Sequence, residues 1–178
     1  MRRLFLAAAL VALAGSAAAR AQETPAAEVF GGYAYGGSGA HGWNGSVAVN
    51  VRPWLGLVGD FGGTYASFDS ADASERIRTH SYLFGPRFSA RRHARVTPFA
   101  HALLGAAHTD SRAREAGLDF HFTDTAFAAA LGGGLDVRVR PRIAVCVVQL
   151  DYLRTNFFGG SQNNGRISAG LVIRLGDR

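Results

Sequence analysis

The chain has 178 residues, of which 48% are hydrophobic, 18% are charged and 11% are aromatic. This apolar and aromatic content excludes an intrinsically disordered chain, and the length excludes a large multidomain enzyme. All 19 basic residues are arginine, scattered singly or in pairs, so the formal net charge of +6 does not indicate a nucleic-acid partner. The single cysteine, Cys146, excludes an intrachain disulfide and a cysteine-based zinc site.

The first 21 residues have the pattern of a cleaved secretory signal peptide. Arg2 and Arg3 are followed by an apolar run over residues 4–15 and by a small-x-small cleavage site at residues 19–21. Cleavage would make Gln22 the mature N-terminus and remove three arginines, which lowers the net charge from +6 to +3. A membrane anchor is the alternative, but the apolar run is short for a spanning helix. We expect an exported protein whose single domain covers residues 22–178.

The rest of the chain alternates between apolar and polar or small residues, as strands do when their two faces meet different surroundings. The alternation is clearest over residues 43–52, 55–62, 131–139 and 168–175, and weaker segments cover residues 27–36, 79–89, 96–107 and 143–155. Most of these eight segments are near the 9–11 residues that a tilted membrane strand needs. No segment of the mature chain predicts a helix convincingly.

The connections between these segments alternate in length. Those at residues 52–54, 90–95 and 140–142 are short, whereas those at 36–42, 66–78, 108–124 and 156–164 are mostly longer and rich in Gly, Ser, Asp and Asn. Long loops at one end and tight turns at the other are typical of an outer-membrane barrel. The sequence therefore predicts an all-β fold, an eight-stranded antiparallel up-and-down transmembrane β-barrel. Pro86 and Pro98 count against their two strands unless they mark bulges or strand ends.

A soluble barrel of the lipocalin type would place the apolar residues inside, whereas a membrane barrel places them outside. The polar positions carry many small residues, which fit the narrow interior of eight strands, and a strand ends the chain where lipocalins carry a helix. Aromatic residues near strand ends are candidates for interfacial girdles, namely Trp43, Trp54, Tyr65, Tyr82, Phe127 and Tyr152. We therefore expect these side chains to face lipid: Val47, Val49, Leu57, Phe61, Leu135, Val137, Leu171 and Ile173.

Several segments also resemble the small outer-membrane β-barrels of the OmpA and OmpX type, single-domain porin-family barrels of Gram-negative bacteria. The resemblance is carried by residues 28–33, 82–88, 97–100, 130–136 and 167–174, in that order, and covers nearly all of residues 27–176. It implies the bacterial outer membrane as the location, with outer-membrane lipid and the outer-membrane assembly machinery as partners. The partner of the extracellular loops is not implied.

Charged residues at the polar positions predict an ion-pair network inside the barrel. Four acids against five bases are close to balance, as an interior poor in water requires. The predicted network consists of Glu28, Arg52, Asp60, Arg87, Asp136, Arg138, Asp151, Arg166 and Arg174. We expect at least two mid-strand carboxylates to contact an arginine there, although charges near the barrel ends, such as Arg52 and Arg138, are alternatively solvated.

Other candidate sites are weaker. His108, Asp110, His121 and Asp124 share one predicted loop but match no metal-ligand spacing, so a solvated loop is the preferred interpretation. His101 is expected to be a hydrogen-bonded interior residue, and Cys146 a small packing residue. A basic rim is expected at the short turns, where its charges keep the turns out of the bilayer or contact an anionic polymer: Arg52, Arg91, Arg92, Arg95, Arg140 and Arg142.

Three functions fit a small barrel. A structural or surface-interaction protein with a plugged polar lumen is our prediction, with no catalytic, cofactor or metal site. A narrow porin-like channel for ions or small solutes is the alternative, although eight strands leave little room for a pore. A membrane-embedded lipid-modifying enzyme is the third, but no converging set of His, Ser and acidic residues can be assembled from the sequence.

Overall fold

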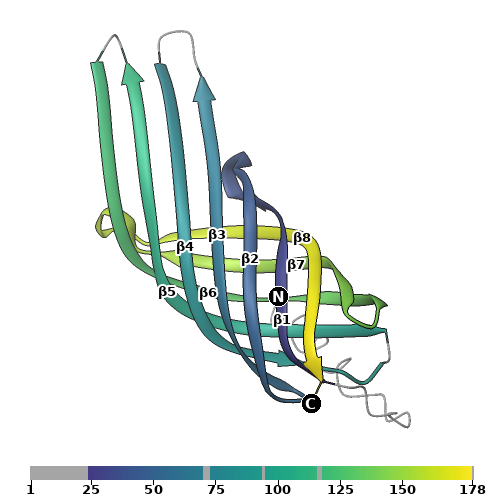
Figure 1. Cartoon of the computed structure of the whole chain (residues 1–178). Helices are drawn as coiled ribbons and strands as arrows, with labels where there is room; N and C mark the ends of the chain where they lie inside the picture. The colour runs from purple at the N-terminus through teal and green to yellow at the C-terminus, as the bar shows by residue number, and fades with distance from the viewer. Residues whose placement is uncertain (1–23, 70–72, 94, 116–117, 178) are drawn as a thin grey trace, which may run out of the picture.

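The computed structural model describes residues 24–69, 73–93, 95–115 and 118–177, which form a closed β-barrel (Figure 1). The predicted signal peptide lies outside the described residues. The described residues include two short 3-10 turns, η1 (Gly37–Gly39) and η2 (Phe157–Gly159), and no helix long and apolar enough to span a membrane.

Eight strands follow one another around the barrel, each antiparallel to the next, and β1 pairs with β8 to close it. The predicted fold class is therefore confirmed. The strands are β1 (Pro25–Gly36), β2 (His41–Arg52), β3 (Leu55–Asp69), β4 (Ala73–Ser89), β5 (Val96–Glu115), β6 (Leu118–Arg140), β7 (Ile143–Thr155) and β8 (Gln162–Asp177).

The two ends of the barrel differ. Pro25 pairs with Asp177, so the start of β1 and the end of β8 lie at the same end as the short connections β2–β3, β4–β5 and β6–β7. We call this the short-turn end. At the opposite end β3, β4, β5 and β6 continue beyond their neighbours and project as two long hairpins (Figure 1). We call their distal part, residues 64–69, 73–80, 108–115 and 118–127, the extension.

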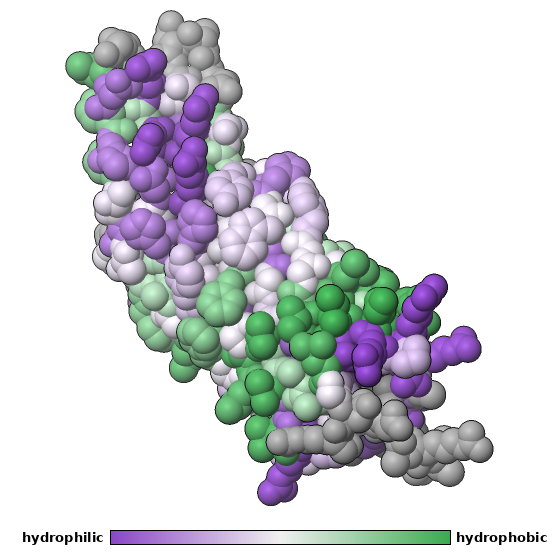
Figure 2. Space-filling view, viewed as in Figure 1, coloured by the Kyte–Doolittle hydropathy of each residue, from purple (hydrophilic) through white to green (hydrophobic). Residues whose placement is uncertain are grey.

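The apolar residues of the barrel face outward. Leu57 is 60% exposed and Leu171 is 58% exposed, while the alternate positions, such as Asp60 and Val172, are buried inside. All eight residues expected to face lipid lie on the outer face, with Phe61, Leu135 and Val137 partly covered by neighbours. Figure 2 shows the resulting hydrophobic band below a hydrophilic extension and above a hydrophilic lower rim. The orientation of a membrane barrel, and not that of a lipocalin, is confirmed.

The barrel interior is packed with side chains. One apolar cluster includes Val58, Leu83, Leu103 and Ala128, and a second joins Phe30, Phe99, Ala144, Cys146 and Val172. Cys146 is thus a buried packing residue, as expected. Apolar side chains therefore share the barrel interior with the ion pairs described below.

Two predicted loops prove to be strands. Residues 66–78 and 108–124 were expected to be loops, but they form most of the extension, with uninterrupted registers from Asp69–Ser74 inward and from Glu115–Leu118 inward. The prediction was wrong because these residues are rich in polar side chains on the outer face. Polar residues at these positions argue against a strand that faces lipid, but they suit a strand whose outer face meets water.

Two local irregularities place particular residues. The β4–β5 ladder is interrupted at Pro86, between the pairs Phe84–Leu104 and Arg87–His101, because proline has no N–H to donate. In β7 the register shifts between Cys146 and Gln149, which is a β-bulge. Through this bulge Cys146 and Asp151, which have opposite parity, both point into the barrel.

Candidate functional site

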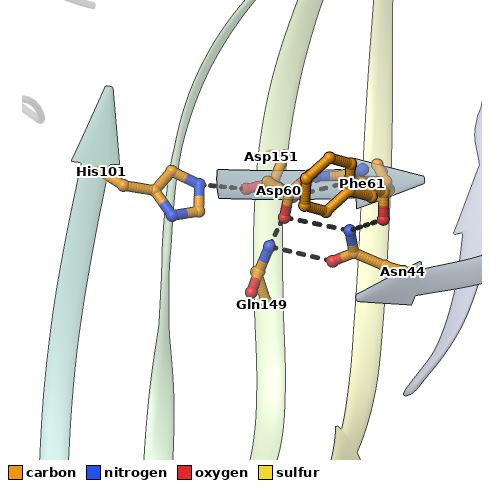
Figure 3. A network of polar contacts seen from close by, with 7 residues as sticks. Asn44, Asp60, Phe61, His101, Gln149 and Asp151 are labelled. Carbon is orange, nitrogen blue, oxygen red and sulfur yellow. Dashed lines mark hydrogen bonds and ion pairs between the residues drawn. The ribbon is translucent and has the colours of Figure 1, made fainter. Parts of the chain in front are cut away.

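A buried ion network crosses the middle of the barrel and joins residues from five strands (Figure 3). Arg166 of β8 donates from Nη2 to Asp60 Oδ1 of β3 and to Asp151 Oδ2 of β7, both at 2.8 Å. His101 of β5 donates from Nε2 to the other oxygen of Asp151 at 2.7 Å. Two carboxylates thus share one guanidinium in an interior where charge–charge interactions are stronger than in water.

Two amide side chains complete this network. Asn44 donates from Nδ2 to Asp60 Oδ2 at 3.0 Å, and Gln149 donates from Nε2 to Asp151 Oδ2 at 2.9 Å (Figure 3). Gln149 also bonds to Asn44 Oδ1 at 3.4 Å, which links the two carboxylates by a second route. Sequence reasoning based on charge alone missed both amides, although Asn44 lies at a polar position of the alternation.

Glycine provides the room that the network needs. A methyl group at Gly132 would overlap Asp151 Oδ1 and would lie 2.9 Å from His101 Nε2. Gly132 pairs with Asp151 on one side and with His101 on the other, so it stands between the two partners in the sheet. Because glycine has no side chain, the Asp151 carboxylate and the His101 imidazole can contact each other on the inner face of the sheet.

A second set of ion pairs lies toward the short-turn end. Arg87 contacts Asp136 at 2.6 Å, and its guanidinium lies 3.8 Å from the centre of the Phe99 ring. Glu28 pairs with Arg91 at 2.7 Å and with Arg174 at 3.3 Å. The second contact is an ion pair without hydrogen-bond geometry. Three guanidiniums therefore surround two carboxylates toward this end of the barrel.

Arg91 corrects one prediction. The sequence predicts it in the basic rim at the short turns, but its side chain is buried and donates from both terminal nitrogens to Glu28. The reason is electrostatic, because the turn that carries Arg91 lies below a buried carboxylate whose pairing offsets the cost of its desolvation. The other five members of the predicted rim are exposed or partly exposed.

The structure places the nine predicted network residues in two groups. Seven are buried inside the barrel and form ion pairs: Glu28, Asp60, Arg87, Asp136, Asp151, Arg166 and Arg174. Arg52 is exposed at the end of β2 and Arg138 is partly exposed near the end of β6, and neither forms an ion pair with any described residue. These two match the alternative that charges near the ends are solvated.

The outer face of the extension is polar and basic. By alternation it carries Arg76, Arg78, Arg112 and Arg114 against Asp69, Asp110 and Asp119, which leaves an excess of one positive charge before the histidines are counted. Arg76 and Arg112 stand directly opposite each other on neighbouring strands. Like charges in this position destabilise a sheet, so this pair is not explained by folding alone.

Two acids on this face are held ionised by their neighbours. His121 donates to Asp110 at 2.7 Å, and this hydrogen bond lowers the pKa of Asp110. Arg114 donates to both oxygens of Asp119, at 2.7 and 3.1 Å, and lowers the pKa of that carboxyl in the same way. Both acids are therefore committed to local partners, and Arg112, which faces Arg76, also pairs with Asp110 at 3.4 Å.

The predicted histidine–carboxylate group does not gather at one point. His108 and Asp110 are on the outer face of β5 and His121 is on that of β6, whereas Asp124 belongs to the inner face. His108 bonds to Thr125 at 2.8 Å and His121 bonds to Asp110. Among the described residues no three His, Cys, Asp or Glu side chains are arranged to hold a metal ion.

A comparison with known proteins identifies a family with this architecture. Residues 5–174 match the family model of the outer membrane protein β-barrel domain. No curated protein matches the sequence.

Three solved structures share the fold over most of their length. Ail, the attachment invasion locus protein of Yersinia pestis, is 17% identical with a TM-score of 0.61, over 86% of this chain and 100% of Ail. Neisserial surface protein A is 13% identical with a TM-score of 0.59, over 84% and 96%. The N-terminal barrel of Pseudomonas aeruginosa OprF is 12% identical with a TM-score of 0.52, over 85% and 98%. A second Ail structure holds the heparin analogue sucrose octasulfate.

Proposed function

The chain belongs to the outer membrane protein β-barrel domain family, and we propose that it serves in the bacterial outer membrane as a non-catalytic surface-interaction barrel with a plugged lumen. The observation that carries this proposal is the extension, a four-stranded sheet whose outer face presents arginines beyond the apolar belt. The end that carries the extension is then extracellular, and the short-turn end faces the periplasm.

The chemistry of the outer face favours a polyanionic partner, such as a sulfated or phosphorylated glycan. Arg76 and Arg112 stand opposite each other on β4 and β5. Arg112 also pairs with Asp110 at 3.4 Å, and an anionic group bound at this face would offset the remaining excess of positive charge. Guanidinium groups hold sulfate and phosphate with paired N–H donors. The sucrose octasulfate bound by Ail belongs to this chemical class.

The packed interior supports a plugged lumen. Arg166 bonds to Asp60 and to Asp151 across the barrel, and each of the three residues is at most 4% exposed. The Arg91–Glu28 pair lies toward the proposed periplasmic end. A selective pore tends to line its constriction with one sign of charge, whereas these groups are paired. The same pairing supports a non-catalytic role, because His101 and the interior carboxylates are engaged with each other and buried.

Polyanion binding tests the surface role. The full chain in nanodiscs is titrated with dextran sulfate, with neutral dextran as the control ligand. The double variant Arg76→Gln/Arg112→Gln should weaken binding about 10- to 30-fold, at about 1 kcal/mol for each arginine. The matched control is Arg92→Gln/Arg140→Gln, which removes two exposed arginines at the opposite end. Equal losses in both variants, or no binding by the natural chain, would refute the assignment.

Conductance tests the lumen. In a planar bilayer the natural chain should show no large and steady current at moderate voltage. A large ohmic conductance would replace the plugged barrel with the narrow porin-like channel.

A further inference from the structure

The mouth of the barrel contains a cavity of about 310 Å³ between the inner face of the extension and the start of β8. Thr64, Ile77 and Thr109 line one wall, and Leu153, Thr155 and Phe157 line the other. This volume lies at the lower end of the range for small-molecule sites, about 300–1,000 Å³. The cavity therefore has room for a compact ligand, and it is separate from the basic outer face.

The inner face of the extension carries several large apolar side chains although it stands beyond the lipid-facing belt. Alternation places Phe68, Ile77, Phe120 and Phe122 on this face, opposite the arginines of the outer face. Phe68 is 46% exposed and Phe122 is 53% exposed. Contiguous apolar surface that is exposed to water is typical of a binding site.

The Thr155 hydroxyl is an unsatisfied polar group at the cavity wall. Thr155 is 5% exposed, and its hydroxyl oxygen has no hydrogen-bond partner among the described residues. An unsatisfied buried hydroxyl is costly, and a ligand that bonds to it gains more than a ligand that meets solvated groups. The wall thus offers one hydrogen-bonding position below an apolar surface.

The charges of the lining favour an uncharged ligand. Among the described residues that line the cavity, only Arg166 and Glu75 are ionisable. Arg166 is shared between Asp60 and Asp151, and Glu75 accepts a hydrogen bond from Ser111 at 3.1 Å. The remaining lining consists of Gly, Ala, Ser, Thr, amide and apolar side chains.

We infer that this cavity binds a compact, uncharged amphipathic molecule, whose apolar body contacts Phe68 and Ile77 and whose hydroxyl or carbonyl group bonds to Thr155. The inference goes beyond the proposed function, because the polyanion meets the outer face and this ligand meets the inner face. Variants of Arg76 and Arg112 leave the cavity unchanged, so the two proposals fail separately.

The four isoleucines of the chain make a direct test possible. Ile77 lines the cavity, whereas Ile143, Ile167 and Ile173 are exposed on the lipid-facing side. The full chain is labelled at the isoleucine δ1 methyl groups, placed in phosphatidylcholine nanodiscs and titrated with 1-naphthol. The Ile77 signal should shift and saturate, while the other three signals report only partitioning of the probe into lipid.

Variants and probe analogues locate the two halves of the site. Thr155→Val keeps the shape of the side chain and should weaken 1-naphthol about 3- to 10-fold, the value of one hydrogen bond, while 1-methylnaphthalene binds as before. Phe68→Ser should weaken both probes, whereas Tyr65→Ser, on the outer face of the same strand, should weaken neither. An Ile77 signal that only follows the lipid-facing signals would overturn the inference. Tighter binding of naphthalene-1-sulfonate than of 1-naphthol would also overturn it.

Discussion

The barrel and its extension use the same strands with opposite chemistry on their two faces. Along β3 the outer face carries Leu57 in the barrel and Ser67 in the extension, whereas the inner face carries Asp60 in the barrel and Phe68 in the extension. The parity of the strand does not change, because the β3–β4 register runs without a shift. The surroundings change instead, from lipid outside the barrel to water outside the extension.

This contrast shows that burial depends on what surrounds a strand and not on hydrophobicity alone. In the barrel an outward Leu is solvated by lipid, and an inward carboxylate is tolerated because Arg166 pairs with it. In the extension an outward Arg is solvated by water, and the inward apolar residues form the wall of the mouth. The predictions below test this division, from the largest expected effect to the smallest.

Removing the shared cation should have the largest effect. Arg166→Met leaves Asp60 and Asp151 buried without the guanidinium that bonds to both. Loss of one partner from a buried pair costs about 3–5 kcal/mol of unfolding free energy. Urea unfolding in lipid vesicles measures the change. The control is Arg52→Met, which removes an exposed arginine and should change the value by about 0.5 kcal/mol or less; similar losses in both variants would contradict a paired interior.

Arginine placed on the outer face of β3 should separate the lipid-facing part from the water-facing part. Leu57→Arg puts a charge into the hydrophobic band and should cost about 2–4 kcal/mol if Leu57 is near the bilayer midplane. Ser67→Arg makes the same addition on the same face of the same strand, within the extension; because the new arginine stands opposite Arg76, it should cost about 1 kcal/mol or less. Unfolding free energies of both variants, measured in the same vesicles, give the comparison. A large loss at Ser67 would place the extension in the membrane.

Filling the space beside the ion network should have an intermediate effect. Gly132→Ala pushes a methyl group against Asp151 and His101, and overpacking of this kind costs about 1–3 kcal/mol. Gly31→Ala is the matched control, because no atom lies within 4 Å of the added carbon, and it should cost about 0.5 kcal/mol or less. Thermal or urea unfolding distinguishes them. If Gly132→Ala were silent, the close approach of Asp151 and His101 would not be important for stability.

The sequence predicted the barrel because alternation with a period of two survives wherever lipid lies on one side. It also placed Asp60, Asp151 and Arg166 inside, since a charge at a polar position of a lipid-facing strand can only point inward. The interpretation failed for residues 66–78 and 108–124 because alternation there has the opposite sense, with Arg76 outward and Ile77 inward. Alternation with polar residues outward is present there, but it is weaker and reversed relative to the lipid-facing strands, so the polar composition predicts a loop.

Arg91 and Gln149 are two interior residues that alternation could not assign to the inside of the barrel. Arg91 belongs to a turn, so no strand parity applies to it, and its pairing with Glu28 depends on how the turn closes. Gln149 follows the β-bulge of β7, where the parity changes by one residue. A prediction that assumes regular strands therefore could not place either side chain.

The smallest effect on stability is expected from removing most of the β5–β6 hairpin. Thr109 and Asp124 are paired, so residues 110–123 can be replaced by Asn-Gly, which closes a two-residue hairpin at that pair. The removed residues pair with each other and with the distal part of β4, and none belongs to the buried ion pairs. The unfolding free energy should change by about 1 kcal/mol or less, because shortening a surface hairpin alters mainly a small loop-closure cost. Dextran sulfate binding should fall at least as far as in Arg76→Gln/Arg112→Gln, since Arg112 and Arg114 are gone. A loss of stability as large as that of Arg166→Met would mean that the extension supports the barrel, and the division between the two regions would then be wrong.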